Sequence, residues 1–184
     1  MACKIVGLTG FARSGKDTTA AILVAEYGYT RVAFADGVRS MALSVDPLLY
    51  GDIRLSSVVR AVGWEKAKDT IPEVRRLLQA IGTEGVRDHI GPDSWIIACK
   101  RIIDEIDGPV VVTDARFPNE SSAIHSWGGT MVRIIRLNDD GSEFDSGVSR
   151  SHPSEASIPS LPTDFTIEAS SVEELEAKVR ANVR

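Results

Sequence analysis

A glycine-framed loop near the start of the chain constrains the fold most. Residues 10–18 read Gly-Phe-Ala-Arg-Ser-Gly-Lys-Asp-Thr and follow the apolar run at 4–9. Gly10 and Gly15 let the backbone curl with its N–H groups pointing inward, and a helix that begins there adds the positive end of its dipole. The pattern is typical of a phosphate-binding P-loop between a strand and a helix, in which Lys16 reaches the β and γ phosphates of a nucleoside triphosphate.

The residue after the lysine departs from the usual P-loop pattern. Ser or Thr normally follows the lysine and binds magnesium, whereas here Asp17 follows it and Thr18 comes next. Either Thr18 supplies the hydroxyl, or Asp17 acts on the ion through water, since Mg²⁺ keeps several waters and favours carboxylates. We favour Asp17 in a magnesium or substrate role. The predicted nucleotide-binding residues are Gly10, Arg13, Ser14, Gly15, Lys16, Asp17, Thr18 and Thr19.

Length, composition and charge fit a soluble α/β protein with small-molecule partners. The 184 residues, 43% of them hydrophobic, suffice for one domain with a full core. A net charge of -5 argues against a general nucleic-acid-binding surface. Cys3 and Cys99 are too few for a disulfide framework or a zinc site, and no apolar run resembles a membrane span or a signal peptide. We therefore expect a cytoplasmic protein without membrane or polymeric nucleic-acid partners.

Strand patterns alternate with helical patterns along the chain. Strands are expected at 4–9, 30–35, 109–113, 130–137 and 164–168, and helices at 15–27, 36–44, 73–90, 93–106, 119–127 and 171–183, with a mixed stretch up to about residue 70. This alternation predicts an α/β fold with a mostly parallel sheet covered by helices on both faces. Ligands then bind outside the carboxyl ends of the strands, where the P-loop lies.

A second polar block follows an apolar strand. Residues 110–113 read Val-Val-Val-Thr and lead to Asp114 and Arg116. A carboxylate at the end of a buried strand can hold hydrated magnesium, and a nearby arginine can stabilise charge on a phosphoryl group in transfer. The alternative is structural: Asp114 caps the helix that begins near Pro118, and Arg116 pairs with Glu120. The P-loop upstream favours the functional interpretation, so the metal candidates are Asp17, Thr18 and Asp114.

Further blocks complete a set that spans nearly the whole chain. They are Gly-Lys-Asp-Thr-Thr-Ala at 15–20, Phe-Ala-Asp at 34–36, the segment 76–87, Trp95, the segment 113–120, and Ser-His-Pro-Ser-Glu at 151–155. With these blocks the chain resembles the bacteriophage-type deoxynucleoside monophosphate kinases, P-loop enzymes of the nucleoside monophosphate kinase superfamily. The resemblance implies an adenylate kinase-like three-layer sandwich in a single domain at 1–184, with an acceptor-binding insertion at about 36–95. It also implies transfer of the ATP γ-phosphoryl group to a deoxynucleoside monophosphate with Mg²⁺, a homodimer, and the host cytoplasm if a phage encodes the chain.

An acceptor monophosphate needs cations for its phosphate and a pocket for its base. Arg76 and Arg87 are eleven residues apart, so on one continuous helix they would share a face and could clamp the phosphate. Gly82 and Gly85 predict a bend between them. The substrate-binding candidates are Asp36, Arg39, Arg76, Gln79, Gly82, Thr83, Glu84, Arg87, Trp95 and Asp114.

Two of these candidates have structural alternatives. Asp36 ends the second strand and either contacts the sugar or base or caps the helix that runs through Met41. Trp95 either stacks on the base or packs in the core, and the following Ile96 and Ile97 favour the core.

Arginines near the end of the chain extend the catalytic set. Together with Lys16 and Arg116, we assign catalytic roles to Arg136 and Arg150, which could close over the phosphates. The polar stretch 138–152 between them is a candidate lid that excludes water, although its composition is equally typical of a solvated loop. The family often has an asparagine after the last strand; Ala169 stands there in this chain, so adenine recognition is expected from backbone groups.

Two other functions stay open. The chain could be another small-molecule P-loop kinase, similar to dephospho-CoA kinase, with a larger acceptor pocket. It could also be a non-catalytic regulator in which ATP orders residues 138–152, although the arginines around the predicted cleft disfavour this. The apolar residues of 45–72 suit either a homodimer interface or a cover over the acceptor pocket.

Overall fold

The computed structural model describes residues 5–147 and 153–183, and the chain divides into two compact units. The first unit takes its residues from 1–34 and 100–184, and the second consists of residues 35–99. Helix α5 (Ser94–Asp104) begins in the second unit and ends in the first.

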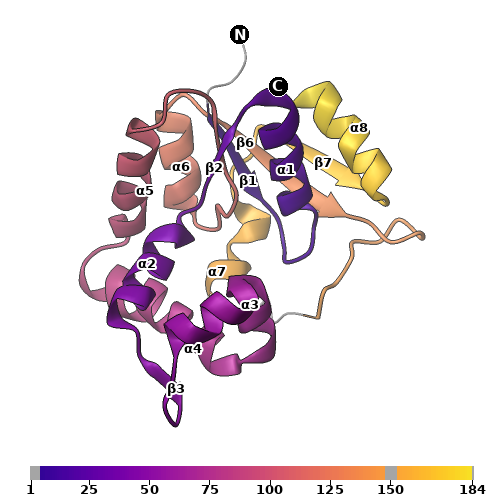
Figure 1. Cartoon of the computed structure of the whole chain (residues 1–184). Coiled ribbons are helices and arrows are strands. Elements are labelled where there is room, and N and C mark those ends of the chain that lie inside the picture. Colours follow the sequence, from indigo (N-terminus) through magenta and orange to yellow (C-terminus); the bar gives the residue numbers. More distant parts are fainter. Residues whose placement is uncertain (1–4, 148–152, 184) are drawn as a thin grey trace. The chain divides into compact units, whose positions relative to one another are not determined.

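A five-stranded parallel sheet organises the first unit (Figure 1). The strands are β1 (Ile5–Thr9), β2 (Thr30–Val32), β5 (Val110–Val112), β6 (Thr130–Arg136) and β7 (Phe165–Ala169), in the order β2-β5-β1-β6-β7. Each neighbouring pair is parallel, so the carboxyl ends of the strands share one edge. The α/β fold with a parallel sheet is therefore confirmed. β1 lies in the centre, which places the loop after it in the middle of the ligand-binding edge.

Helices cover both faces of this sheet. Helices α1 (Lys16–Tyr27) and α8 (Val172–Asn182) lie side by side in Figure 1, and they pack on the face that carries Leu8, Val132 and Ile134. Helix α6 (Pro118–Ser126) covers the other face, where Ile124 and the side chain of Met131 occupy the space that a Cβ on Gly7 would need. The short helix α7 (Pro153–Ala156) and the 3-10 turn η2 (Ile158–Ser160) follow β6 and precede β7.

The second unit is mostly helical. It contains α2 (Ala35–Val45), a hairpin of β3 (Leu48–Tyr50) and β4 (Ile53–Arg54), α3 (Leu55–Thr70), α4 (Pro72–Gln79) and the π-helical segment η1 (Ala80–Arg87). Leu55, Ala67 and Val74 form its main core, and Val38, Val86 and Trp95 form a smaller cluster.

Three sequence-based boundaries need correction. The second strand ends at Val32 and not at residue 35, because α2 already begins at Ala35. The mixed stretch is a hairpin followed by α3, in which Gly63 interrupts the helix with φ +77°. The single helix expected at 73–90 is α4 followed by η1, so the glycines between Arg76 and Arg87 occur where the hydrogen bonding widens to the π pattern.

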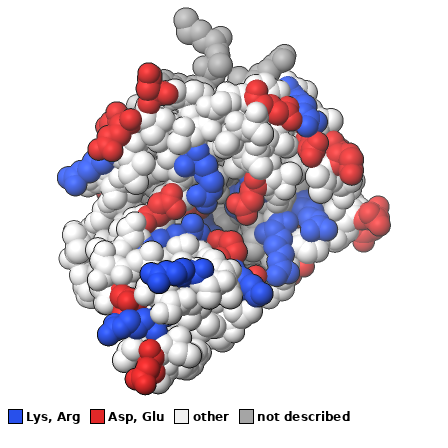
Figure 2. All heavy atoms as spheres, viewed as in Figure 1, with Lys and Arg blue, Asp and Glu red and all other residues white. Residues whose placement is uncertain are grey.

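Two surface features bear on partners. On the face shown in Figure 2, Lys and Arg side chains are interspersed with Asp and Glu side chains. Within residues 5–147 and 153–183, every helix is too short or too polar to cross a bilayer.

Candidate active site

The P-loop joins β1 to α1 through a backbone that only glycine tolerates at its ends. Gly10 has φ +145° and Gly15 has φ +107°, and Arg13 between them has φ +63°. A Cβ on Gly10 would lie 2.3 Å from the carbonyl oxygen of Ile134 on β6. The loop is therefore fitted against the neighbouring strand, and the helix begins directly after Gly15.

The loop surrounds a pocket of about 170 Å³. Its lining consists of Arg13, Ser14, Gly15, Lys16, Asp17 and Thr18. Thr19, also predicted to bind nucleotide, is fully buried behind this pocket and donates its Oγ1 hydrogen to the Gly15 carbonyl at 3.1 Å. A larger groove of about 450 Å³ runs along β7 and α8, but its lining includes none of the predicted site residues. We assign the phosphate site to the smaller pocket because Arg13, Lys16 and the first turn of α1 line it.

Lys16 is the first residue of α1, and its side chain reaches back over the loop. Its ammonium group donates to the carbonyl oxygens of Gly10 at 2.8 Å and Phe11 at 2.7 Å, and to Ser14 Oγ at 3.5 Å. The side chain is thus folded over the loop, from which it can reach a phosphate bound to the same amides.

Several charges act on the Lys16 ammonium. The pKa of Lys16 is lowered from its usual 10.5 to about 8: burial is the largest cause and the nearby Arg116 guanidinium the next, whereas Asp17, Glu155 and Asp114 partly offset the shift. The fold therefore brings the predicted residues Arg116, Asp17 and Asp114 close to the P-loop lysine. It also brings Glu155, which belongs to the Ser-His-Pro-Ser-Glu block but was not among the predicted site residues.

The residues after β5 do not make the helix cap that the sequence offered as an alternative role for Asp114. Asp114 accepts a hydrogen bond from the Phe34 amide at 2.8 Å. The start of α6 is capped by the buried Glu120, whose carboxylate accepts from the amides of Arg116 at 2.7 Å and Phe117 at 3.1 Å. The helix-cap interpretation of Asp114 is therefore wrong. Glu120 instead fixes the backbone from which the Arg116 side chain extends.

The Arg116 guanidinium pairs with Glu155 on α7, and not with Glu120 as the surface-pair alternative proposed. Glu155 is 8% exposed, whereas the Arg116 side chain is 39% exposed. One side of the guanidinium is thus held by a buried carboxylate, and the rest can face a ligand. The Ser-His-Pro-Ser-Glu block contained a signal for Glu155, but the sequence does not reveal its partner.

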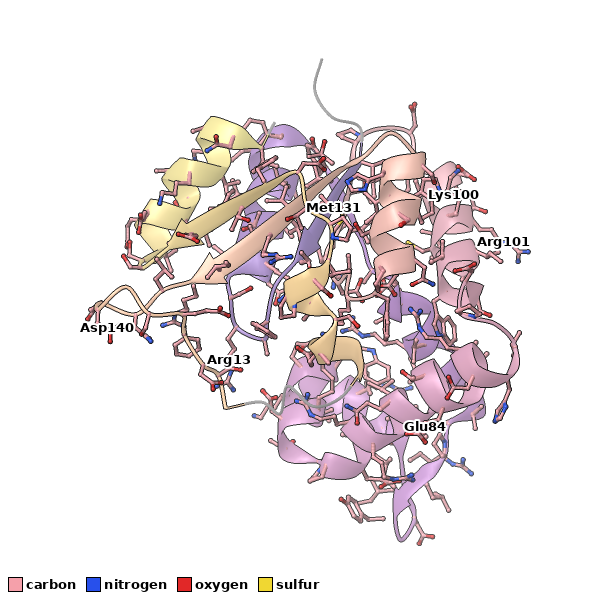
Figure 3. The ribbon with its side chains drawn as sticks, turned by 180° about the vertical axis from the view of Figure 1, so that it is seen from behind. Arg13, Glu84, Lys100, Arg101, Met131 and Asp140 are labelled. Atoms are coloured by element: carbon pink, nitrogen blue, oxygen red, sulfur yellow. The ribbon has the colours of Figure 1, made fainter. Side chains whose placement is uncertain are left out.

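Arg136, another catalytic candidate, is the last residue of β6 and precedes the turn that contains Asp140. Arg136 stacks over the ring of Phe144, with its guanidinium carbon 4.2 Å from the ring centre. Figure 3 shows Arg13 extending from the P-loop and Asp140 at the tip of this turn. Arg150 and residues 148–152 of the candidate lid lie outside the described residues. The roles of Arg136 and Arg150 stay predictions.

The acceptor candidates other than Asp114 all lie in the second unit. Arg39 pairs with Asp36 at 3.5 Å and Glu65 at 3.0 Å. Asp36 is in the first turn of α2, one residue past its start, so it is not the N-cap. Arg76 pairs with Glu73 at 2.6 Å, and Arg87 donates to the Pro92 carbonyl at 3.0 Å. Gln79 ends α4, and Gly82, Thr83 and Glu84 lie in η1.

Trp95 is a packed side chain of the second unit. It is 5% exposed, its ring would lie 2.9 Å from a Cβ on Gly37, and its Nε1 donates to the Gly82 carbonyl at 2.8 Å. These contacts fit the core alternative, and a stacking role stays a prediction.

Replacing Trp95 with phenylalanine is expected to lower the free energy of unfolding by about 1 kcal/mol, because the Gly82 carbonyl loses its partner. Chemical denaturation measures this loss, with Trp64→Phe in the same unit as the control for reduced ring size. Equal losses in the two variants would show that the Trp95 hydrogen bond contributes nothing.

A phosphate loop at the carboxyl edge of a parallel sheet, with a lysine over it and an arginine nearby, is typical of P-loop nucleotide-binding proteins. The family profile described as deoxynucleotide monophosphate kinase matches residues 52–179. The chain belongs to this family, as its sequence motifs predicted, and it is a phosphotransferase enzyme.

Individual relatives agree with the family match. A protein of Acanthamoeba polyphaga mimivirus, provisionally named deoxynucleotide monophosphate kinase, is 25% identical over 180 residues, covering 85% of this chain and 83% of the relative. The deoxynucleoside-5'-monophosphate kinase of Escherichia phage T5 is 33% identical over 86 residues, which are 46% of this chain and 34% of that enzyme. Shikimate kinase from Aquifex aeolicus aligns over 96% of this chain and 94% of its own, at 14% identity and a TM-score of 0.46.

Proposed function

We propose that the chain transfers the γ-phosphoryl group of ATP to a deoxynucleoside 5'-monophosphate, giving a deoxynucleoside diphosphate and ADP. The observation that carries this proposal is the cationic P-loop pocket in a member of the deoxynucleotide monophosphate kinase family. The names of the viral relatives support the choice of acceptor.

The donor phosphates would bind in the P-loop pocket. Backbone amides between Gly10 and Lys16 surround the β phosphate, and the Lys16 ammonium exchanges its loop carbonyl partners for phosphate oxygens. Catalysis then depends on positioning and on stabilisation of negative charge.

The P-loop pocket suits a magnesium ion that is bound by few protein side chains and by the nucleotide phosphates. No group of three His, Cys, Asp or Glu that could hold a metal occurs in the described part of the chain. Mg²⁺ in kinases is typically held by one or two carboxylates together with substrate phosphates. Asp17 and Thr18 line the pocket, and the Asp114 carboxylate acts on the same Lys16 ammonium. These three residues would hold the ion, which neutralises phosphate charge when bound.

The arginines would stabilise the transferring group. The Arg116 guanidinium is close enough to Lys16 to act on its charge, and we assign supporting roles to Arg136 and Arg150. The attacking atom is a phosphate oxygen that is ionised at neutral pH, so a strong general base is unnecessary. The acceptor phosphate and base would contact Asp36, Arg39, Arg76, Gln79, Gly82, Thr83, Glu84 and Arg87. In this account, residues 36–95 form the acceptor-binding insertion and residues 138–152 form the lid.

ATP binding is expected to weaken as the pH rises through about 8, where free Lys16 loses its proton. The lowered pKa means that Lys16 is charged below this pH and neutral above it, and the phosphates bind the charged form. Affinity should then fall by up to about tenfold per pH unit. Calorimetric titration of ATP between pH 7 and 9.5 measures this decline, and buffers of different ionisation enthalpy should reveal proton uptake. Constant affinity without proton uptake would contradict the charge state assigned to Lys16.

The acceptor is tested by measuring ADP formation with ATP and Mg²⁺. Each deoxynucleoside monophosphate, each ribonucleoside monophosphate, dephospho-CoA and a no-acceptor control are compared. Turnover that depends on a deoxynucleoside monophosphate is the expected result. Turnover only with dephospho-CoA would indicate the other kinase class, and ATP binding without any turnover would favour a regulator. Sedimentation of the same protein tests the predicted homodimer.

A further inference from the structure

Arg116 is held from two sides by glutamates that lie on different elements. Glu120 on α6 accepts from its backbone amide at 2.7 Å, and Glu155 on α7 pairs with its guanidinium. Both glutamates are buried, with exposures of 2% and 8%. Glu120 fixes only the backbone, so the direction of the guanidinium depends on Glu155.

The segment that carries Glu155 is fastened to the sheet. Arg133 on β6 donates to the carbonyl oxygens of Pro159 at 3.0 Å and Leu161 at 2.8 Å. Ser121 on α6 donates to the Pro162 carbonyl at 2.8 Å, and Ile158 is buried with 2% exposure. Side chains of two elements thus hold the residues that follow Glu155.

This anchorage lies next to the P-loop. Arg133 is the register partner of Thr9, the last residue of β1 before the loop, so both side chains project from the same face of the sheet. Glu155 is also close enough to Lys16 to act on its charge. The 153–161 segment is therefore fixed relative to the residues that bind the donor phosphates.

We propose that Glu155 is a positioning residue of the phosphoryl-transfer site, which holds the Arg116 guanidinium beside Lys16 before the nucleotide binds. This inference rests on the proposed function. Two neighbouring cations repel each other, and a solvent-accessible arginine would otherwise turn towards water. The buried carboxylate offsets that repulsion and keeps the guanidinium aligned, while its exposed side stays available for phosphate oxygens.

Glu155→Ala is expected to lower kcat by about 10- to 100-fold, the loss typical of a misplaced catalytic group. Glu155→Gln, which keeps a neutral acceptor, should lose less. Glu173→Gln on an exposed turn of α8 is the charge-matched control and should retain wild-type kcat. Thermal unfolding of each variant separates loss of fold from loss of activity.

A double-mutant comparison distinguishes positioning from a direct or purely structural role. If Glu155 acts through Arg116, Glu155→Ala should cause no further loss of kcat in an Arg116→Gln background. Equal losses in both backgrounds, or no loss in the wild-type background, would overturn the proposal. ATP affinity is measured in the wild type, the two single variants and the double variant, and it gives a readout that does not depend on turnover. The proposed function is tested separately, by the turnover of the wild-type protein.

Discussion

Replacing Lys16 with methionine is expected to lower kcat by about 10²- to 10³-fold, the loss typical of removing one preorganised donor to a developing charge. Methionine keeps the length of the side chain and removes its charge. The partly buried ammonium contacts two loop carbonyls, and Lys16 lines the P-loop pocket. The loss should therefore appear in chemistry and in ATP affinity, with the fold retained.

The matched control for Lys16→Met is Lys178→Met on α8. Lys178 lies in the same unit, where its ammonium contacts Glu174 at 2.7 Å and the Glu168 carbonyl at 2.8 Å. Initial rates with ATP and the preferred acceptor, together with circular dichroism, compare the two variants. Full activity in Lys16→Met, or an equal loss in Lys178→Met, would contradict the role of the P-loop lysine.

Gly10→Ala is expected to lower the free energy of unfolding by about 3–5 kcal/mol, or to displace the loop and abolish ATP binding. The added Cβ would lie 2.3 Å from the Ile134 carbonyl oxygen and 2.7 Å from Ser14 Oγ. The backbone oxygen belongs to the central part of the sheet and cannot move away without breaking the strand pairing. The φ of +145° adds backbone strain.

Gly28→Ala is the control that has the backbone strain of a positive φ without a steric clash of the added Cβ. Gly28 ends α1 with φ +69°, and a Cβ there would meet no described atom within 4 Å. Its replacement should cost only about 1–2 kcal/mol, the cost of a left-handed alanine. Denaturant titration and ATP titration compare the two variants. Similar stability and binding in Gly10→Ala and Gly28→Ala would refute the close approach of the loop to β6.

The P-loop and the parallel sheet were predictable because their signals are local. The spacing of Gly10, Gly15 and Lys16 requires one backbone shape, and continuous apolar runs such as 110–112 are typical of strands buried on both faces. The hairpin at 48–54 was not predictable, since strands of three and two residues are too short to show alternation. The π-helical segment was missed because its apolar spacing also suits an α-helix.

The site was predictable only in part, because long-range pairing leaves no periodic signal. Asp114 and Arg116 follow a strand, so their place at the sheet edge follows from topology. Both Asp114 and Glu120 are close in sequence to the start of α6. Only the folded backbone determines that the Glu120 carboxylate accepts from the amides of Arg116 and Phe117. The Arg116–Glu155 pair joins residues that are 39 positions apart. The two residues meet only because the chain folds α7 back towards the end of β5. The sequence around Arg116 does not indicate Glu155 as its partner, and the sequence around Glu155 does not indicate Arg116.

The most direct measurement is transfer of label from [γ-³²P]ATP to an unlabelled deoxynucleoside monophosphate. The purified protein is incubated with Mg²⁺, and the nucleotides are separated. Labelled deoxynucleoside diphosphate is expected in the wild-type reaction, and its loss is expected in Lys16→Met. Label that remains in ATP or appears only as inorganic phosphate, in a folded protein that binds ATP, would contradict the account.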